Sequence, residues 1–226
     1  MFEKFTNREN KIFEVLNFFV EQKLNFVVIG GYAVSAYKHR FSIDADLVIR
    51  KEDKETFAKL LEKMNFKKTI MKYLDHVYAP EFIRYETKEE LSISIDLLIN
   101  GVGSRTTNAS FNLEELKKHS KQRKILGTEK ETTVLVPDRS ILVILKLHSG
   151  RLTDFRDIVA ICKNLDHQLI KKIIWRGKKE IVRENIKKLL QLIEEPNFIN
   201  SFKGVFAEKK YDADIQEVKK LKKLLD

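Results

Sequence analysis

Hydrophobic residues in the first part of the chain follow two different periods. Over residues 9–22 and 51–64 they recur every three to four positions, which is typical of amphipathic helices. Residues 26–29 form a short, β-branched run that ends in two glycines, and such a run predicts a strand buried on both faces. The same rules predict helices over residues 9–22, 32–38, 51–64 and 112–120. They predict strands within residues 26–29, 45–50, 66–73, 76–86, 91–99, 121–126 and 132–136.

The pattern changes to helical spacing throughout after Pro137. Proline suits the first turn of a helix, and Asp138 adds a favourable charge near the positive end of the helix dipole. We therefore predict two domains, an α/β domain over residues 1–137 and an α-helical domain over residues 138–226.

Charge and composition narrow the classes of function. The 226 residues include 43 lysines and arginines against 33 acidic residues, and the net charge of +10 favours phosphate-bearing partners. A lysine-rich surface that serves solubility or heat resistance explains the charge equally well. No apolar run approaches the ~20 residues that span a bilayer, the N-terminus lacks a signal-peptide pattern, and the single Cys162 has no internal disulfide partner. We therefore expect a cytoplasmic protein that does not enter membranes.

An acidic pair lies in the segment FSIDADLVI. Side chains alternate along a strand, so Ser42, Asp44 and Asp46 point to the same face. Two neighbouring carboxylates that enter a core repel each other, and a divalent cation such as Mg²⁺, which prefers oxygen ligands, removes that repulsion. The alternative is that both aspartates lie on an exposed strand end and bind only water.

A third acidic residue, Asp96, lies in the strand-like run SISIDLLI. Carboxylates are seldom fully buried without a partner, so an aspartate between apolar neighbours is unusual. If this strand pairs beside the strand of Asp44 and Asp46, three carboxylates converge in the arrangement that holds two metals ~3.5–4 Å apart for phosphoryl displacement. The alternative is a structural ion pair between Asp96 and an arginine such as Arg84.

The Gly30–Gly31 pair follows the first predicted strand and precedes a short predicted helix. Glycines at such a turn let the backbone approach a ligand closely, and the N–H groups at a helix start are available to a phosphate. A plain strand-to-helix turn has the same sequence. The pair therefore gains meaning only together with the aspartates.

The combination of VVIGG, SIDAD and SIDLL resembles the DNA polymerase β-like nucleotidyltransferase superfamily. The resemblance implies an α+β fold, in which a core with a mixed β-sheet flanked by helices is followed by an α-helical C-terminal domain. It implies that Gly30, Gly31 and Ser42 contact the phosphates of a nucleoside triphosphate (NTP). It implies that Mg²⁺ or Mn²⁺ is held by Asp44, Asp46 and Asp96. Asp96 would also help to activate the attacking hydroxyl.

A second resemblance lies in ILKLHSGRLTDFRDIVAI, which is similar to the K-x-(4–5)-R-x-x-D-x-x-D segment of the AbiEii-type nucleotidyltransferase toxins. It implies a catalytic Lys146 and a nucleotide-binding group made of Lys146, Arg151, Asp154 and Asp157. Independently, Lys146 lies in an apolar helical stretch, where a half-buried lysine favours an anion such as a triphosphate. Asp154 and Asp157 share one helix face and lie near enough to orient Arg151 or Lys146. The alternative is a structural Arg–Asp network that joins the two domains.

These observations favour an enzyme with its site between the two domains. It would transfer a nucleoside monophosphate from an NTP to a hydroxyl of RNA such as tRNA, of a protein or of a small molecule, and the net charge favours RNA. The toxin resemblance implies a toxin–antitoxin component with a cognate antitoxin or another protein partner. The alternative is a catalytically inactive nucleotide- or RNA-binding protein that retains the fold. Three intact carboxylates argue against that alternative.

Overall fold

The chain forms two compact units. A computed structural model describes residues 2–74, 78–79, 81–87, 92–204, 206 and 213–225. The first unit comprises Met1–Val102 and Phe111–Pro137, and the second comprises Gly103–Ser110 and Asp138–Asp226. The sequence predicted one division, at residue 137, and did not anticipate that the segment Gly103–Ser110 groups with the helices. Polar contacts explain this grouping, because Ser104 Oγ donates to His148 O at 2.8 Å and Lys178 N donates to Thr107 O at 2.6 Å.

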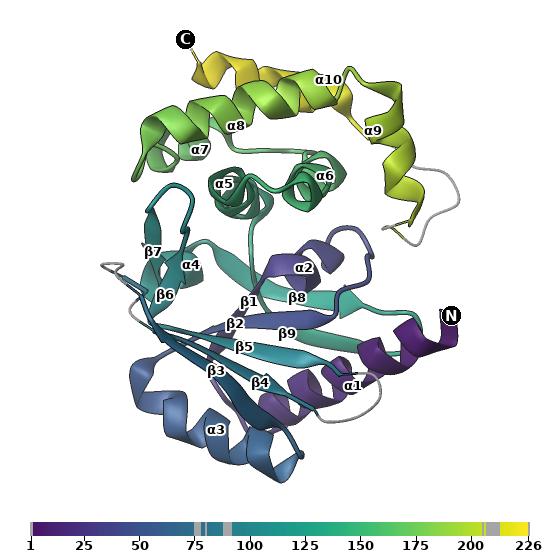
Figure 1. The fold of residues 1–226 in the computed structure, drawn as a ribbon, viewed down its shortest axis with the longest axis vertical. Helices are drawn as coiled ribbons and strands as arrows, with labels where there is room; N and C mark the ends of the chain where they lie inside the picture. Colours follow the sequence, from purple (N-terminus) through teal and green to yellow (C-terminus); the bar gives the residue numbers. More distant parts are fainter. Residues whose placement is uncertain are drawn as a thin grey trace. The chain divides into compact units, whose positions relative to one another are not determined.

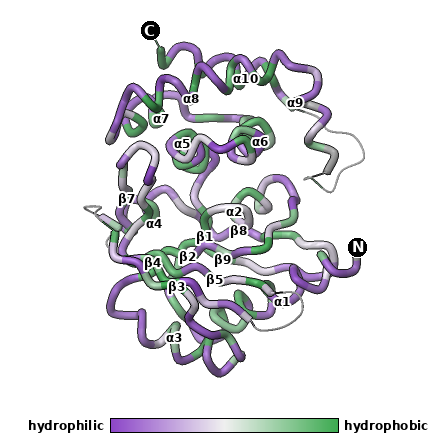
Figure 2. The backbone as a smooth tube through the Cα atoms, in the orientation of Figure 1, coloured by the Kyte–Doolittle hydropathy of each residue, from purple (hydrophilic) through white to green (hydrophobic). Residues whose placement is uncertain are grey.

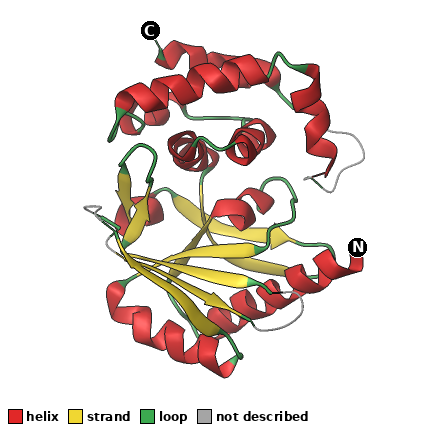
Figure 3. Ribbon diagram, in the orientation of Figure 1, coloured by secondary structure: helices red, strands yellow, loops and turns green. Residues whose placement is uncertain are grey.

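A seven-stranded mixed sheet forms the centre of the first unit. Figures 1 and 3 show this sheet with helices packed against it. The strand order is β3-β4-β5-β2-β1-β9-β8. The pairs β2–β5 and β1–β9 are parallel, whereas the other neighbours in this order are antiparallel. The expected α+β fold with a mixed sheet is confirmed. The strands are β1 (Phe26–Ile29), β2 (Asp44–Ile49), β3 (Lys67–Tyr73), β4 (Glu81–Glu86), β5 (Ser94–Ile99), β8 (Ser120–Leu126) and β9 (Glu131–Pro137).

Helices cover both faces of this sheet. They are α1 (Phe2–Glu21), α2 (Gly30–Ser35), α3 (Lys54–Lys63), which follows the 3₁₀ turn η1 (Lys51–Asp53), and α4 (Leu113–Lys118). In Figure 1, α1 and α3 lie on one face, and α2 and α4 lie on the other. The rings of Phe19, Phe26 and Phe57 pack edge to face between α1, β1 and α3, with 4.9 Å between the centroids of Phe19 and Phe57. In Figure 2, hydrophobic positions appear as green segments among the strands of the sheet.

Several element boundaries differ from the prediction. Helix α1 begins at Phe2 rather than at residue 9, and α2 takes the two glycines into its first turn and ends at Ser35 rather than at residue 38. Residues 100–110, for which no helix or strand was predicted, contain β6 (Gly101–Gly103) and the start of β7 (Ser110–Asn112), which pair as a separate two-stranded sheet. The predicted strand over residues 76–86 falls partly on positions 76, 77 and 80, which lie outside the described residues.

The second unit is helical, as predicted. Its elements are α5 (Arg139–Ser149), α6 (Leu152–Ile161), α7 (His167–Ile173), α8 (Lys179–Leu192), α9 (Pro196–Asn200), η2 (Ser201–Gly204), α10 (Ile215–Lys219) and η3 (Lys220–Leu224). Helix α5 contacts α6, α7 and α8 and forms the centre of the unit. Within the described residues, no helix combines the length and the apolar character needed to cross a bilayer.

The position predicted for Pro137 was wrong. Pro137 ends strand β9, and the N-cap of α5 is Asp138, whose carboxylate accepts a hydrogen bond from Ile141 N at 3.0 Å. A capping carboxylate satisfies one of the N–H groups that the first turn of a helix leaves unpaired. The helix therefore begins one residue after Asp138, at Arg139.

Candidate functional site

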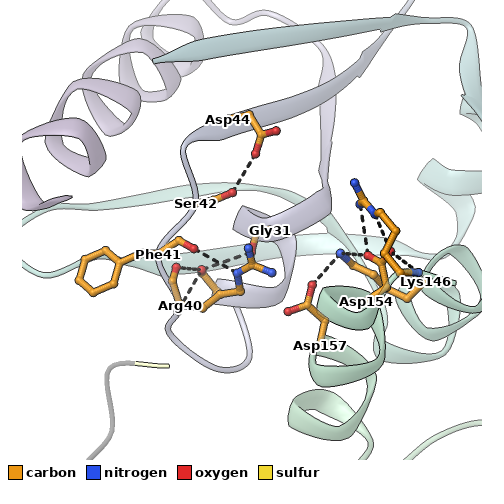
Figure 4. A network of polar contacts seen from close by, with 10 residues as sticks. Gly31, Arg40, Phe41, Ser42, Asp44, Lys146, Asp154 and Asp157 are labelled. Atoms are coloured by element: carbon orange, nitrogen blue, oxygen red, sulfur yellow. Dashed lines mark hydrogen bonds and ion pairs between the residues drawn. The ribbon is translucent and has the colours of Figure 1, made fainter. Parts of the chain in front are cut away.

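Strand β2 presents Asp44 and Asp46 on one face of the sheet. Asp46 pairs in register with Ile29 at the end of β1, and both aspartates remain partly exposed. Ser42, just before the strand, donates from Oγ to Asp44 Oδ1 at 2.9 Å (Figure 4), and Tyr32 Oη donates to Ser42 O at 3.1 Å. These contacts fix the orientation of Asp44 from the side of α2. The expected shared direction of the two carboxylates follows from their alternate positions along the strand.

The two glycines make room for these side chains. Gly30 has a φ of +67°, and a Cβ atom added there would overlap Asp46 Oδ2. A Cβ atom added to Gly31 would lie 2.6 Å from Ser42 Oγ and 3.2 Å from Arg40 Nη2. A larger residue at either position would therefore displace the neighbouring polar groups. We expected the glycines to admit a ligand; the close neighbours that the structure shows are polar side chains of the same unit.

Asp96 lies on the adjacent strand β5 and is only 2% exposed. It is the register partner of Asp46 on one side and of Arg84 in β4 on the other. Partners in register point to the same face of a sheet. Sheet pairing therefore sets three charged side chains in one row across three strands.

Arg84 binds both carboxylate oxygens of Asp96. Its Nε lies 2.7 Å from Oδ1 and its Nη2 lies 2.7 Å from Oδ2, and Nη2 also lies 3.9 Å from Asp44 Oδ2. The hydrogen bonds to Asp96 raise the pKa of Arg84 above its already high ordinary value, so the guanidinium stays charged. Burial raises the pKa of Asp96, and the bonds from Arg84 act against that rise. Asp44, Asp46, Arg84 and Asp96 are called the sheet cluster below.

The sheet cluster differs from the expected three-carboxylate metal site. Among the residues that the structure describes, no group of three acidic, histidine or cysteine side chains is placed to hold a metal ion. Asp44 and Asp46 fit a divalent cation, because they offer partly exposed carboxylate oxygens on one face of one strand. Asp96 does not fit in the same way, because Arg84 occupies both of its oxygens. The ion pair considered as the alternative for Asp96 is therefore present.

A second charged cluster lies within the helical unit. Lys146 Nζ in α5 lies 2.9 Å from Asp154 Oδ1 and 2.7 Å from Asp157 Oδ2, both in α6 (Figure 4). Arg151 Nε lies 2.8 Å from Asp154 Oδ2, although the Arg151 side chain is 72% exposed. Burial opposes ionisation of Asp154, but Lys146 and Arg151 outweigh it and lower its pKa to about 2. Lys146, Arg151, Asp154 and Asp157 are called the helix cluster below.

The helix cluster changes the interpretation of Lys146. We expected a half-buried lysine that favours an external anion, but Lys146 is 7% exposed and has two aspartates at ion-pair distance. The expected contacts of Asp154 with Arg151 and Lys146 are present. Roles of these residues toward a nucleotide stay predictions.

Sequence reasoning did not assign Arg84 to the site itself. The sequence shows an arginine in one predicted strand and a lone aspartate in the next. The register that pairs Arg84 with Asp96 cannot be read from the sequence. Arg40, in the segment that precedes the acidic pair, lies beside Gly31.

The chain has the fold of solved nucleotidyltransferases. No family model and no curated protein matches it. The solution structure of the antibiotic-resistance factor ANT(2'')-Ia matches with a TM-score of 0.51 and 14% identity, over 84% of this chain and 96% of that chain. A crystal structure of a protein from H. pylori that carries a provisional name as a nucleotidyltransferase matches with a TM-score of 0.51 and 14% identity, over 98% of each chain. At this identity the likeness shows the fold alone, and the AbiEii-type resemblance stays a prediction.

Proposed function

We propose that the chain is a nucleotidyltransferase that transfers a nucleoside monophosphate from an NTP to an acceptor hydroxyl. One observation supports this most strongly: Gly30 and Gly31 accommodate Asp46 and Ser42, so that Asp44 and Asp46 stand side by side, partly exposed, on a sheet of the nucleotidyltransferase type. In the reaction, the acceptor hydroxyl loses its proton to solvent as its oxygen bonds to the α-phosphorus, the bond from that phosphorus to the oxygen that bridges it to the β-phosphate breaks, and pyrophosphate leaves.

Asp44 and Asp46 would hold Mg²⁺ or Mn²⁺. When bound, such a cation neutralises charge on the phosphates and aligns the entering and leaving oxygens. The chain's own contribution is positioning: Ser42 orients Asp44 through the 2.9 Å hydrogen bond, and the space left at Gly30 accommodates the Asp46 carboxylate. Positioning and electrostatics supply most of the catalysis of phosphoryl transfer.

Two observations bear on which molecule carries the acceptor hydroxyl, and they support different molecules. The +10 net charge supports RNA such as tRNA. A crystal structure of ANT(2'')-Ia in complex with adenylyl-2''-tobramycin has a TM-score of 0.51 to this chain, at 13% identity over 76% of this chain and 95% of that chain, which supports a small molecule. The choice of tRNA, and a role in a toxin–antitoxin pair with a cognate partner, rest on the toxin resemblance, and a protein hydroxyl is the third alternative.

A second candidate function is binding without transfer. The bidentate contact with Arg84 satisfies Asp96 without any metal, and a protein that binds nucleotide or RNA needs no third ligand there. The two functions differ in whether a covalent product forms.

The test is incubation of the protein with each of the four NTPs labelled at the α-phosphate, with Mg²⁺ or Mn²⁺, and with total tRNA, a protein extract or an aminoglycoside panel as acceptor. The proposal expects transfer of label that is lost in Asp44→Ala and kept in Asp53→Ala. Asp53 is the matched control because it lies at the start of α3 and its side chain makes no cap hydrogen bond. Nucleotide binding without transfer to any acceptor would favour the binding protein, and transfer unchanged in Asp44→Ala would refute the assignment of the site.

A further inference from the structure

Arg84 is placed by the sheet rather than by a flexible contact. It lies opposite Asp96 in the antiparallel β4–β5 pair, so both side chains leave the sheet on the face that also carries Asp46. Two parallel hydrogen bonds of 2.7 Å give the fork-to-fork geometry that guanidinium and carboxylate groups form most strongly. The same guanidinium nitrogen lies 3.9 Å from Asp44. A single fixed positive charge therefore lies beside two of the three carboxylates.

We propose that the Arg84 guanidinium serves as a permanent cation of this site and takes the place that a second divalent cation would occupy between Asp96 and Asp44. The site would then bind a single divalent cation, through Asp44 and Asp46. This inference rests on the proposed function for its biological meaning, but it concerns the number of metal ions and can fail independently.

The charge of Arg84 reduces the need for a second divalent cation. Its guanidinium already compensates the Asp96 carboxylate at 2.7 Å and lies 3.9 Å from Asp44. A second divalent cation held by Asp96 would lie within a few ångströms of the guanidinium, and the two positive charges would repel each other. Without Arg84, the third carboxylate would add the charge that a second cation needs.

Burial argues against release of Arg84 during binding. Asp96 is 2% exposed, so a departing guanidinium would leave an ionised carboxylate with little access to water. The Arg84 side chain is 29% exposed and contacts Asp96 directly, because β4 and β5 are neighbours in the sheet. We therefore expect the Arg84 guanidinium to stay bound to Asp96 when a metal ion binds, and not to move away and release the carboxylate.

The test counts bound Mn²⁺ per chain from the loss of the electron paramagnetic resonance signal of free Mn²⁺, with Mn²⁺ alone and with Mn²⁺ plus inorganic tripolyphosphate as a base-independent probe. We expect one Mn²⁺ in the full-length wild type, in Asp96→Asn and in Arg84→Lys, which keeps a cation. We expect the count to double in Arg84→Ala, because Asp96 becomes available. The double variant Arg84→Ala/Asp96→Asn should return to one.

Controls separate folding and location from metal count. Arg50→Ala breaks an exposed pair with Glu114 in the same unit and should leave the count at one. Asp46→Asn should abolish binding in the wild-type background. Circular dichroism shows which variants fold; if Arg84→Ala does not, Asp96→Asn still decides, because it lowers the count only if Asp96 is a metal ligand.

Two results would overturn the inference: two Mn²⁺ in the wild type with a loss of one in Asp96→Asn, or an Arg84→Ala variant that is folded and binds no more Mn²⁺ than the wild type. A wild type that binds no Mn²⁺ would also overturn the inference of a single cation, whereas a failure of the proposed function alone would appear as one bound Mn²⁺ per chain without transfer of label to any acceptor. The two failures are therefore distinguishable.

Discussion

The sheet cluster and the helix cluster are both built from carboxylates and cationic side chains, but the sheet cluster has more carboxylates than cations and the helix cluster has equal numbers of each. In the helix cluster, two cations meet two carboxylates that are at most 1% exposed, and successive helices supply all four residues. In the sheet cluster, one guanidinium lies within 4 Å of two of the three carboxylates, and the Asp44 side chain is 36% exposed. Buried carboxylates that already have cations beside them need no added cation, whereas partly exposed neighbouring carboxylates favour one.

The largest expected effect is on stability in the helix cluster. Lys146→Met leaves two buried aspartates facing an uncharged side chain, which should lower the free energy of unfolding by about 3–5 kcal/mol. Urea denaturation measures this. Lys124→Met is the matched control, because the Lys124–Glu131 pair is more than half exposed on both sides and should contribute less than about 1 kcal/mol. Equal losses in the two variants would remove the distinction between the clusters.

The next effect is expected at Gly30 in the sheet cluster. Gly30→Ala places a methyl group against Asp46 Oδ2 at a φ of +67°, which should cost about 2 kcal/mol or more and abolish Mn²⁺ binding. Gly150→Ala has a similar φ of +70° in the helical unit and should cost stability while leaving Mn²⁺ binding unchanged. Thermal denaturation and Mn²⁺ titration measure both. Retained Mn²⁺ binding in a folded Gly30→Ala variant would contradict the assignment of Asp46.

Acid should weaken the helix cluster through Asp154. Its folded-state pKa of about 2 lies below the ordinary value of 3.8, so its stabilising contribution is complete above about pH 4 and is lost as the pH falls toward 2. The shift corresponds to about 2 kcal/mol. Unfolding free energies at pH 5 and pH 2 should therefore fall less in Asp154→Asn than in the wild type. An identical pH dependence in both proteins would show that Asp154 is not the titrating group.

The smallest effect is expected at Asp44. Because its side chain is partly exposed and has carboxylate neighbours, Asp44→Asn should change the free energy of unfolding by less than about 1 kcal/mol. Urea denaturation of this variant without metal measures the free energy of unfolding. A loss as large as that of Lys146→Met would show that Asp44 has a structural role.

The sequence predicts much of the fold because its signals are local. The apolar run before Gly30, the alternation around Asp96 and the helical spacing after residue 137 each depend on neighbouring residues. The strand order and the register do not, because they are set by packing between distant segments. This explains why Asp96 could be recognised as unusual, whereas its contact with Arg84 rather than with a metal could not be decided. It also explains why the burial of Lys146 was underestimated, since its partners lie in the next helix.

The central proposal is that the sheet cluster transfers nucleotides, and pyrophosphate release by Asp46→Asn tests it most directly. The measurement compares wild type, Asp46→Asn and the exposed control Glu52→Gln, with each NTP, Mn²⁺ and the acceptor panel. Metal-based charge stabilisation supplies several kcal/mol, so the rate should fall by about a thousandfold or more in Asp46→Asn and stay unchanged in Glu52→Gln. Release by Asp46→Asn at the wild-type rate would contradict the proposal.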